Sequence, residues 1–262
     1  MVRHEDGQVR SLRPLGAALI GVVWAMVGLL PIPAQATTRP FAPDGVLFFP
    51  SVAGLMPRLD LIHPCSASVV HSAGHDLVAT AAHCLYGAGP TIEFVPGFHD
   101  GKAPFGVWSV TRLYVESSWK SSEDPRADVA FLRIAPLRGR QIEDVVGARR
   151  LGTPVVGARV TVSGFPLQSD IPSVCTGILG LTVGYPTVRC PGGGMVDGVS
   201  GGAWVQGGIL VGVVGGLEQG GCSPQIAYSA RFGTASRQLW LRAQAGGPGD
   251  TVRPGFFANS CR

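Results

Sequence analysis

The amino-acid sequence predicts an all-β fold, and three observations support this prediction. The 262-residue chain contains 38 glycines and 21 prolines, which divide its apolar segments into short runs. These runs are rich in β-branched and aromatic residues, and turn-forming residues bound them. Only 15% of the residues are charged. A secreted, turn-rich barrel or sandwich of short strands fits this pattern.

Six expected strands precede an Arg- and Gly-rich stretch at 135–152, which we interpret as a linker, and four follow it. Residues 72–75 are expected to form a hairpin turn. One helix is expected at 234–245, after Gly233 and before a Gly-Gly-Pro stop. The expected strands are 46–49, 65–71, 76–80, 91–95, 107–115, 129–134, 155–164, 175–183, 209–214 and 226–230.

Residues 1–36 have the features of a signal peptide. Three arginines open the segment, residues 15–30 are apolar and uncharged, and AQA at 34–36 offers a small-x-small cleavage site. Two prolines ahead of that site favour cleavage, but 15–30 approaches a short membrane span, so an uncleaved anchor is the alternative. Removal of 1–36 leaves 18 basic and 15 acidic residues without a basic run, and we expect no nucleic-acid partner.

All six cysteines lie after this segment, which predicts three disulfides in an oxidising compartment. Cys175 and Cys190 bracket an expected hairpin, so we favour a bridge between them, which leaves Cys222 for Cys261. The competing set is Cys190–Cys222 with Cys175–Cys261. No C-x-x-C pair is present, which argues against a zinc site.

Three segments far apart in the sequence each carry one member of a nucleophilic triad. His83 lies in TAAHC, Asp128 precedes the apolar run VAFLRI, and Ser200 lies in GVSGG. A serine hydroxyl is a weak nucleophile at neutral pH and needs a histidine to accept its proton and a carboxylate to orient that histidine. The order His, Asp, Ser is one of the known chain orders of this constellation. Asp128 is preferred to Asp124, because Asp124 lies in a polar loop whereas a carboxylate at the head of a buried strand needs a partner.

With these residues the chain resembles the chymotrypsin/trypsin-like serine proteases over about 46–232, and most closely the bacterial secreted members. The resemblance implies two packed six-stranded antiparallel β-barrels with a C-terminal helix, an active cleft between them, and no cofactor. It implies that His83 is the base, Asp128 its partner and Ser200 the nucleophile, with the amides of Gly198 and Ser200 as oxyanion hole. A Cys65–Cys84 disulfide matches the family arrangement.

The expected organisation has four parts. A signal peptide (1–36) is followed by an N-terminal barrel (37–137) that carries His83 and Asp128. A C-terminal barrel (138–232) carries Ser200, and a helix and tail (233–262) complete the chain.

The chain departs from the animal digestive members of this family at the residue before the nucleophile. Those members carry an aspartate there, which binds the freed N-terminus on activation. This chain has Val199, and the sequence after Ala36 begins TTRP rather than Ile-Val-Gly-Gly. We therefore expect an enzyme that is active without N-terminal insertion.

The substrate pocket implied by the resemblance contains Gly194, Gly215, Leu217 and Ile226. Gly194 lies six residues before Ser200, where a trypsin-type pocket has its carboxylate. Leu217 and Ile226 stand where open pockets have glycines. We therefore expect small or medium apolar side chains on the acyl side of the cleaved bond.

His71 and His75 are four residues apart, but a strand and a turn do not place them on one face as a helix does, and we expect no third ligand near them. We interpret them as surface residues and predict no metal site. Taken together, the sequence predicts a secreted, monomeric serine endopeptidase that acts on proteins or peptides through an acyl-enzyme. We expect no membrane contact after signal cleavage. The alternatives are a secreted pseudoprotease or partner-activated binding module of the same fold, and a protein held at the cell surface by an uncleaved helix.

Overall fold

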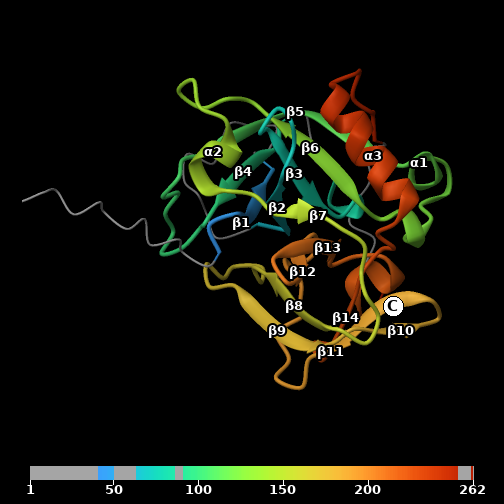
Figure 1. Cartoon of the computed structure of the whole chain (residues 1–262). Helices are drawn as coiled ribbons and strands as arrows, with labels where there is room; N and C mark the ends of the chain where they lie inside the picture. Colours follow the sequence, from blue (N-terminus) through green and yellow to red (C-terminus); the bar gives the residue numbers. More distant parts are fainter. Residues whose placement is uncertain (1–40, 50–62, 86–90, 253–260, 262) are drawn as a thin grey trace, which may run out of the picture. The chain divides into compact units, whose positions relative to one another are not determined.

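A computed structural model describes residues 41–49, 63–85, 91–252 and 261 (Figure 1). The expected signal peptide lies outside the described residues. Strands dominate the described part, with a few short helices and one longer C-terminal helix, so the all-β prediction is confirmed. Among the described residues, none of the helices combines the length and the apolar character that crossing a membrane requires.

The first half of the chain is a closed barrel of six strands in which every neighbouring pair is antiparallel. Around the barrel the order is β1-β2-β3-β6-β5-β4. Every residue of β1, β2 and β3 is buried, including the polar side chains of Asp44, Ser66 and Ser68. The strands are β1 (Asp44–Phe48), β2 (Cys65–Val70), β3 (Leu77–Thr80), β4 (Glu93–Pro96), β5 (Trp108–Val115) and β6 (Ala130–Ile134).

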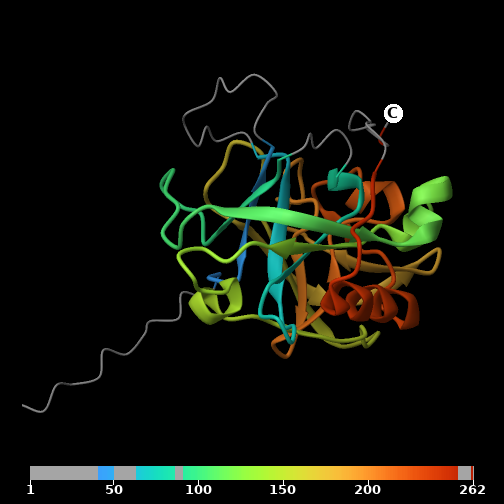
Figure 2. The same ribbon diagram turned by 90° about the horizontal axis from the view of Figure 1, so that it is seen from above.

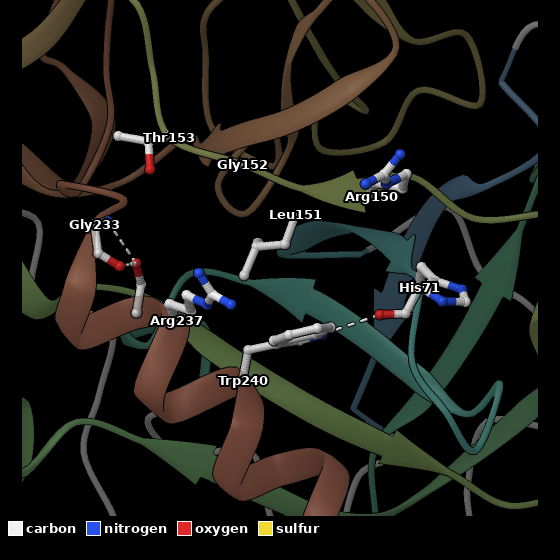
Figure 3. Close-up of a pocket in the computed structure, with 9 residues that line it drawn as sticks. His71, Arg150, Leu151, Gly152, Thr153, Gly233, Arg237 and Trp240 are labelled. Atoms are coloured by element: carbon white, nitrogen blue, oxygen red, sulfur yellow. Dashed lines mark hydrogen bonds between the residues drawn. The ribbon is translucent and has the colours of Figure 1, made fainter.

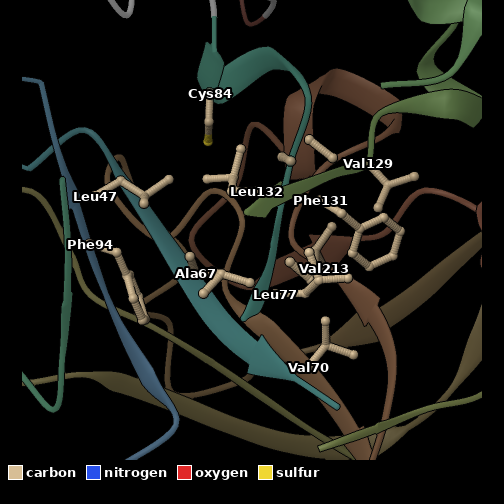
Figure 4. Close-up of a cluster of buried hydrophobic side chains, with 14 of the residues drawn as sticks. Leu47, Ala67, Val70, Leu77, Cys84, Phe94, Val129, Phe131, Leu132 and Val213 are labelled. Atoms are coloured by element: carbon tan, nitrogen blue, oxygen red, sulfur yellow. The ribbon is translucent and has the colours of Figure 1, made fainter. Parts of the chain in front are cut away.

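The side chains inside this barrel form a continuous apolar core (Figure 4). Leu47, Phe94 and Phe131 come from three different strands and are completely buried. Val213, from the second half of the chain, belongs to the same core. The two halves are therefore joined by shared apolar packing as well as by the linker.

The second half consists of two sheets. They are joined at one side because the chain runs directly from one sheet to the other, and at the other side by a single bridge, so that together they form a ring. One sheet has the order β7-β13-β12-β8-β9, and the other has the order β10-β11-β14. Strand β10 directly follows β9, and a bridge between Val214 and Ser229 links the end of β13 to β14. The strands are β7 (Arg150–Leu151), β8 (Arg159–Gly164), β9 (Ser173–Ile178), β10 (Gly180–Thr182), β11 (Tyr185–Arg189), β12 (Ala203–Gln206), β13 (Ile209–Val213) and β14 (Ile226–Tyr228).

The C-terminal helix α3 (Thr234–Ala245) packs against β5 and β6 of the first barrel, as Figures 1 and 2 show. It has the predicted bounds. Leu239 and Ala243 are buried under it, and the guanidinium of Arg133 donates to the last carbonyls of the helix at 3.0 Å. The helix therefore anchors the second half of the chain to the back of the first barrel.

Three features of the fold were not expected from the sequence. The linker contains a short helix, α2 (Ile142–Val146), and the strand β7, which pairs parallel with β13. A second short helix, α1 (Ser117–Ser122), follows β5. Besides β7, the strands β11 and β12 also lie outside the expected strand segments.

The six cysteines form Cys65–Cys84, Cys175–Cys190 and Cys222–Cys261, the set that the sequence analysis favoured. The last disulfide fastens Cys261 near the C-terminus to the loop after η3 (Leu217–Gly220).

Candidate active site

His83 opens a single 3-10 turn, η1 (His83–Leu85), directly after β3. Its neighbour Cys84 is bonded to Cys65 at the start of β2, so the turn is fastened to the adjacent strand of the barrel. Ala81, Ala82 and Leu85 are buried, and the side chain of His83 is only 5% exposed. The small apolar residues of this segment thus let the barrel wall close around His83.

Asp128 holds the imidazole in one orientation. Its Oδ2 atom lies 2.8 Å from the Nδ1 atom of His83, and its Oδ1 atom accepts the backbone N–H of His83 at 2.9 Å. The carboxylate is completely buried, between the turn η2 (Pro125–Ala127) and β6. Because Nδ1–H donates to the carboxylate, the Nε2 atom is left as the proton acceptor.

A third donor to this carboxylate comes from the second half of the chain. The backbone N–H of Gly216 donates to Oδ2 of Asp128 at 2.8 Å. Gly215 is packed so closely that a Cβ atom there would lie 2.8 Å from the same oxygen. A buried carboxylate is costly without such partners, and here three N–H groups satisfy it.

Asp124, the competing carboxylate, has a different position. Its side chain accepts the backbone N–H of Arg126 at 2.9 Å and caps η2. It is partly exposed and has only a loose contact with the Arg126 side chain. Asp124 therefore shapes the turn that leads to Asp128, and Asp128 is the carboxylate next to His83.

The turn that carries Ser200 is docked onto the strands that lead to His83. The N–H of Ser66 in β2 donates to the carbonyl of Ser200 at 2.7 Å, and Gly201 N–H donates to the carbonyl of Val214 at 2.7 Å. A Cβ atom on Gly201 would lie 2.1 Å from Oγ1 of Thr80, so only glycine fits at this contact.

Within the described residues, no hydrogen bond joins the hydroxyl of Ser200 to His83. The structure therefore brings the two segments together without closing the contact between the reacting atoms. Catalytic hydrogen bonds are often long in the absence of substrate and shorten in the reacting complex.

Two backbone amides near Ser200 are available to a ligand. In the described part of the chain, the N–H groups of Gly198 and Ser200 donate to no acceptor. Gly198 has φ 95°, and a Cβ atom there would lie 2.1 Å from the backbone nitrogen of Leu167. The carbonyl of Gly198 accepts a hydrogen bond from the hydroxyl of Ser66 at 2.9 Å, which fixes the orientation of this loop.

The sequence model of the Trypsin family matches residues 51–236. The chain belongs to the trypsin family. Solved structures agree: the protease Anisep from Arthrobacter nicotinovorans is 25% identical, with a TM-score of 0.66 over 79% of this chain and 97% of that chain. A comparison with curated proteins finds no match.

Two further solved structures share the fold. The thermostable serine protease AL20 from an extremophilic microorganism is 24% identical, with a TM-score of 0.67 over 79% of this chain and 99% of that one. Human heparin binding protein is 19% identical, with a TM-score of 0.58 over 84% of this chain and 96% of that one. The trypsin-family fold thus occurs both in proteases and in a protein described by its binding.

The four pocket residues suggested by the trypsin-family resemblance have different surroundings. A Cβ atom on Gly194 would lie 3.0 Å from Oγ of Ser173, whereas Gly215 lies against Asp128 rather than along an open wall. Leu217 begins η3, and Ile226 begins β14 opposite Arg189. Leu217 and Ile226 are half-buried.

A cavity of about 590 Å³ lies elsewhere, between β7 and α3. Leu151, Arg237 and Trp240 line it, and none of the three triad candidates does (Figure 3). The indole of Trp240 donates to the carbonyl of His71 at 3.0 Å along its edge. Cavity size alone therefore does not locate the site that the triad geometry indicates.

Sequence reasoning missed two residues that position the site. Gly216 supplies a backbone N–H to Asp128, and its only signal is a Gly-Gly pair after an apolar strand. Ser66 donates its hydroxyl to the carbonyl of Gly198 and accepts the N–H of Phe165 at 2.7 Å. Both act across the two halves of the chain, which a pattern within one segment does not reveal.

Proposed function

We propose that this trypsin-family member is a secreted serine endopeptidase that uses Ser200, His83 and Asp128. The observation that carries the proposal is the contact between Asp128 and His83, in which the buried carboxylate lies 2.8 Å from Nδ1 of the imidazole. The turn that carries Ser200 is hydrogen-bonded to Ser66 in β2, the strand that pairs with β3 ahead of His83. A core histidine without a catalytic role does not need such a partner, because its neutral form requires no buried charge beside it.

The chemistry follows from the oriented imidazole. Oγ of Ser200 attacks the carbonyl carbon of the peptide bond while its proton passes to Nε2 of His83, and Asp128 stabilises the resulting imidazolium. The amides of Gly198 and Ser200 hold the oxyanion. His83 then gives the proton to the leaving amine, which breaks the C–N bond and leaves an acyl-enzyme. Water, deprotonated by His83, releases the acid and restores Ser200.

The enzyme is active without insertion of a new N-terminus. Val199 is only 4% exposed. A Cβ atom on Gly164 would lie 2.9 Å from its Cα and Cβ atoms, so Val199 is tightly enclosed. An apolar side chain at this position packs without a charged partner, whereas an aspartate there needs one.

The enzyme functions outside the cell as a monomer, on protein or peptide substrates. Three disulfides support this location, because such bonds persist in oxidising compartments. The half-buried Leu217 and Ile226 support a preference for small or medium apolar side chains on the acyl side of the cleaved bond.

Covalent labelling tests the proposed nucleophile. Purified, fully oxidised protein is treated with a fluorophosphonate and analysed by intact mass and peptide mapping. We expect one adduct, on Ser200, which Ser200→Ala abolishes. Ser109→Ala, at an exposed serine in β5 outside the site, is the matched control and keeps the adduct. A folded protein that forms no adduct would overturn the proposal that this protein is a serine endopeptidase, and it would support a binding module of the same fold.

A further inference from the structure

Four side chains with metal-binding chemistry meet where α2 touches the β2–β3 hairpin. His71 follows β2, His75 ends the hairpin turn, and Glu143 and Asp144 lie in the first turn of α2. Nδ1 of His71 lies 2.6 Å from Oε1 of Glu143, and Nδ1 of His75 lies 2.6 Å from Oδ1 of Asp144. The sequence analysis found no third ligand near the two histidines, and the structure corrects this, because the linker helix brings one.

The ligand atoms are already gathered within a small space. Those of His71, His75 and Glu143 all lie within 4.8 Å of one another. The ring centroids of the two imidazoles lie 6.0 Å apart, with an angle of 51° between the ring planes. Bonds of about 2.0–2.1 Å to a tetrahedral ion place its ligand atoms about 3.3 Å apart, so modest side-chain rotations are sufficient.

Backbone contacts hold this arrangement in place before any ion binds. The N–H of Glu143 donates to the carbonyl of His75 at 3.1 Å, and the other carboxylate oxygen of Glu143 accepts the N–H of Ser72 at 3.2 Å. The N–H of His75 donates to the carbonyl of Ser72 at 3.0 Å and closes the turn, in which His75 has φ 54°. This left-handed conformation is uncommon for a residue other than glycine.

Access and charge also suit a cation. The side chains of His71 and His75 are 50% and 43% exposed, so an ion enters from solvent without opening the fold. Two carboxylates with two neutral imidazoles balance the charge of a divalent ion. The guanidinium of Arg140 is nearby, but it donates to the backbone carbonyl of Asp144 and leaves the carboxylate to His75.

We propose that His71, His75 and Glu143 bind a divalent ion of the Zn²⁺ class. Mixed imidazole and carboxylate ligands favour this class over Mg²⁺ or Ca²⁺, which prefer oxygen alone. Asp144 accepts the N–H of His75 and orients that ring, as carboxylates commonly do for metal-binding histidines. On binding, the Nδ1 proton that the neutral His71 ring shares with Glu143 moves to Nε2 of the same ring, which leaves Nδ1 and the carboxylate free for the ion.

The site is structural. It joins α2 in the linker to the β2–β3 hairpin, and β3 leads directly to His83. The carbonyl of His71 also accepts the indole N–H of Trp240 in α3. A bound ion therefore stabilises the junction of barrel, linker and C-terminal helix without touching the triad.

Zn²⁺ titration of the full-length expressed protein, oxidised and freed of metal by chelation, tests the proposal. Isothermal calorimetry is run in a His83→Ala background, which removes the imidazole of the proposed catalytic site. The hydrogen bond to Asp144 and the charge of Glu143 raise the pKa of His75, so the titration is run at about pH 8. We expect one Zn²⁺ per chain, a rise in melting temperature, and visible absorption of the Co²⁺ form typical of tetrahedral coordination.

Variants locate the ion. His71→Ala, His75→Ala and Glu143→Gln are each expected to weaken Zn²⁺ binding by at least about tenfold, and Asp144→Asn by about tenfold. The matched control, His99→Ala, removes a histidine outside the cluster and leaves the affinity unchanged. Circular dichroism verifies the fold of each variant without metal. No binding by the parent protein, or equal binding by a folded His71→Ala/His75→Ala variant, would overturn the proposal.

Discussion

The carboxylate of Asp44, in the first strand of the barrel, forms a bidentate ion pair with the guanidinium of Arg149, which lies near the end of the linker. The same carboxylate accepts the hydroxyl of Ser163 in β8 at 3.1 Å, and Arg149 also donates to Ser68 in β2 at 2.7 Å. Asp44 is only 3% exposed. One ion pair thus connects the first barrel, the linker and the second half of the chain.

Removal of one partner of this pair is expected to be strongly destabilising. Arg149→Ala leaves the Asp44 carboxylate buried and short of donors, and we expect the free energy of unfolding to fall by about 3–5 kcal/mol. Urea unfolding measures the change. Arg126→Ala, at an exposed pair with a 3.8 Å separation, is the control and is expected to change it by less than about 1 kcal/mol. Equal effects of the two variants would contradict the assigned role.

Asp128→Asn is expected to lower kcat by about 10⁴-fold while the protein stays folded. The amide presents a donor where the carboxylate accepts from both His83 and Gly216, so the imidazole loses the tautomer that leaves Nε2 free. Steady-state kinetics on a peptide ester measure the loss. Asp124→Asn serves as the matched control, because its carboxylate only caps a turn, and we expect kcat within about threefold of the parent. A smaller effect at Asp128 than at Asp124 would refute the triad assignment.

Gly201→Ala is expected to displace the turn that carries Ser200. The new methyl group meets Oγ1 of Thr80 at 2.1 Å and the carbonyl oxygen of Ser66 at 2.2 Å, at a backbone with φ 78°. We expect stability to fall by more than about 2 kcal/mol and labelling of Ser200 to slow. At Gly207, with φ 54° and no atom within 4 Å of the added carbon, the same change is expected to cost about 1 kcal/mol and leave labelling intact. Thermal unfolding and fluorophosphonate labelling rates of both variants test this prediction, and equal effects of the two changes would contradict it.

Stability in acid is expected to depend on Asp250, which joins α1, β5 and α3. Burial raises the pKa of this carboxyl, but hydrogen bonds from Arg242, Lys120 and the N–H of Val115 outweigh it and lower the pKa from 3.8 to about 2. A lowered folded-state pKa contributes stability that is complete above the unfolded value and is lost as pH falls through the folded one. The contribution should therefore disappear between about pH 4 and pH 2.

Asp250→Asn tests this dependence. At pH 7 we expect a loss of roughly 1–2 kcal/mol, modest because Lys120 and Arg242 are 39% and 42% exposed. The difference from the parent protein should shrink as pH falls toward 2, and urea unfolding at several pH values follows it. Asp100→Asn, at an exposed carboxylate, provides a control without such a trend. A difference that stays constant with pH would argue against the charge as its source.

The local parts of this fold were accessible from the sequence. The helix at Thr234–Ala245 has its apolar positions, its glycine boundary and its stop within one segment. The strands of the first barrel are short segments rich in apolar and β-branched residues, and they were found within a few positions. Such signals need no information about the rest of the chain.

Contacts between distant segments were not accessible. Nothing near Asp44 in the sequence points to Arg149, which lies 105 residues away. The short helix α2 lies in a segment without helical periodicity, and the packing of its first turn against the hairpin holds it there. Tertiary contacts therefore decide both the linker structure and the meeting of His71 with Glu143.

The support of Asp128 has a consequence for how the protein tolerates mutation. Two of its three donors are main-chain N–H groups, those of His83 and Gly216. Exchanging a side chain does not delete such a group, but a Cβ atom on Gly216 would lie 2.8 Å from the backbone nitrogen of Ala230 at φ 78°, so a substitution there shifts the backbone. Mutations around His83 and Asp128 therefore act on the carboxylate by displacing the backbone rather than by removing a donor, and the glycines are the positions where such displacement is expected.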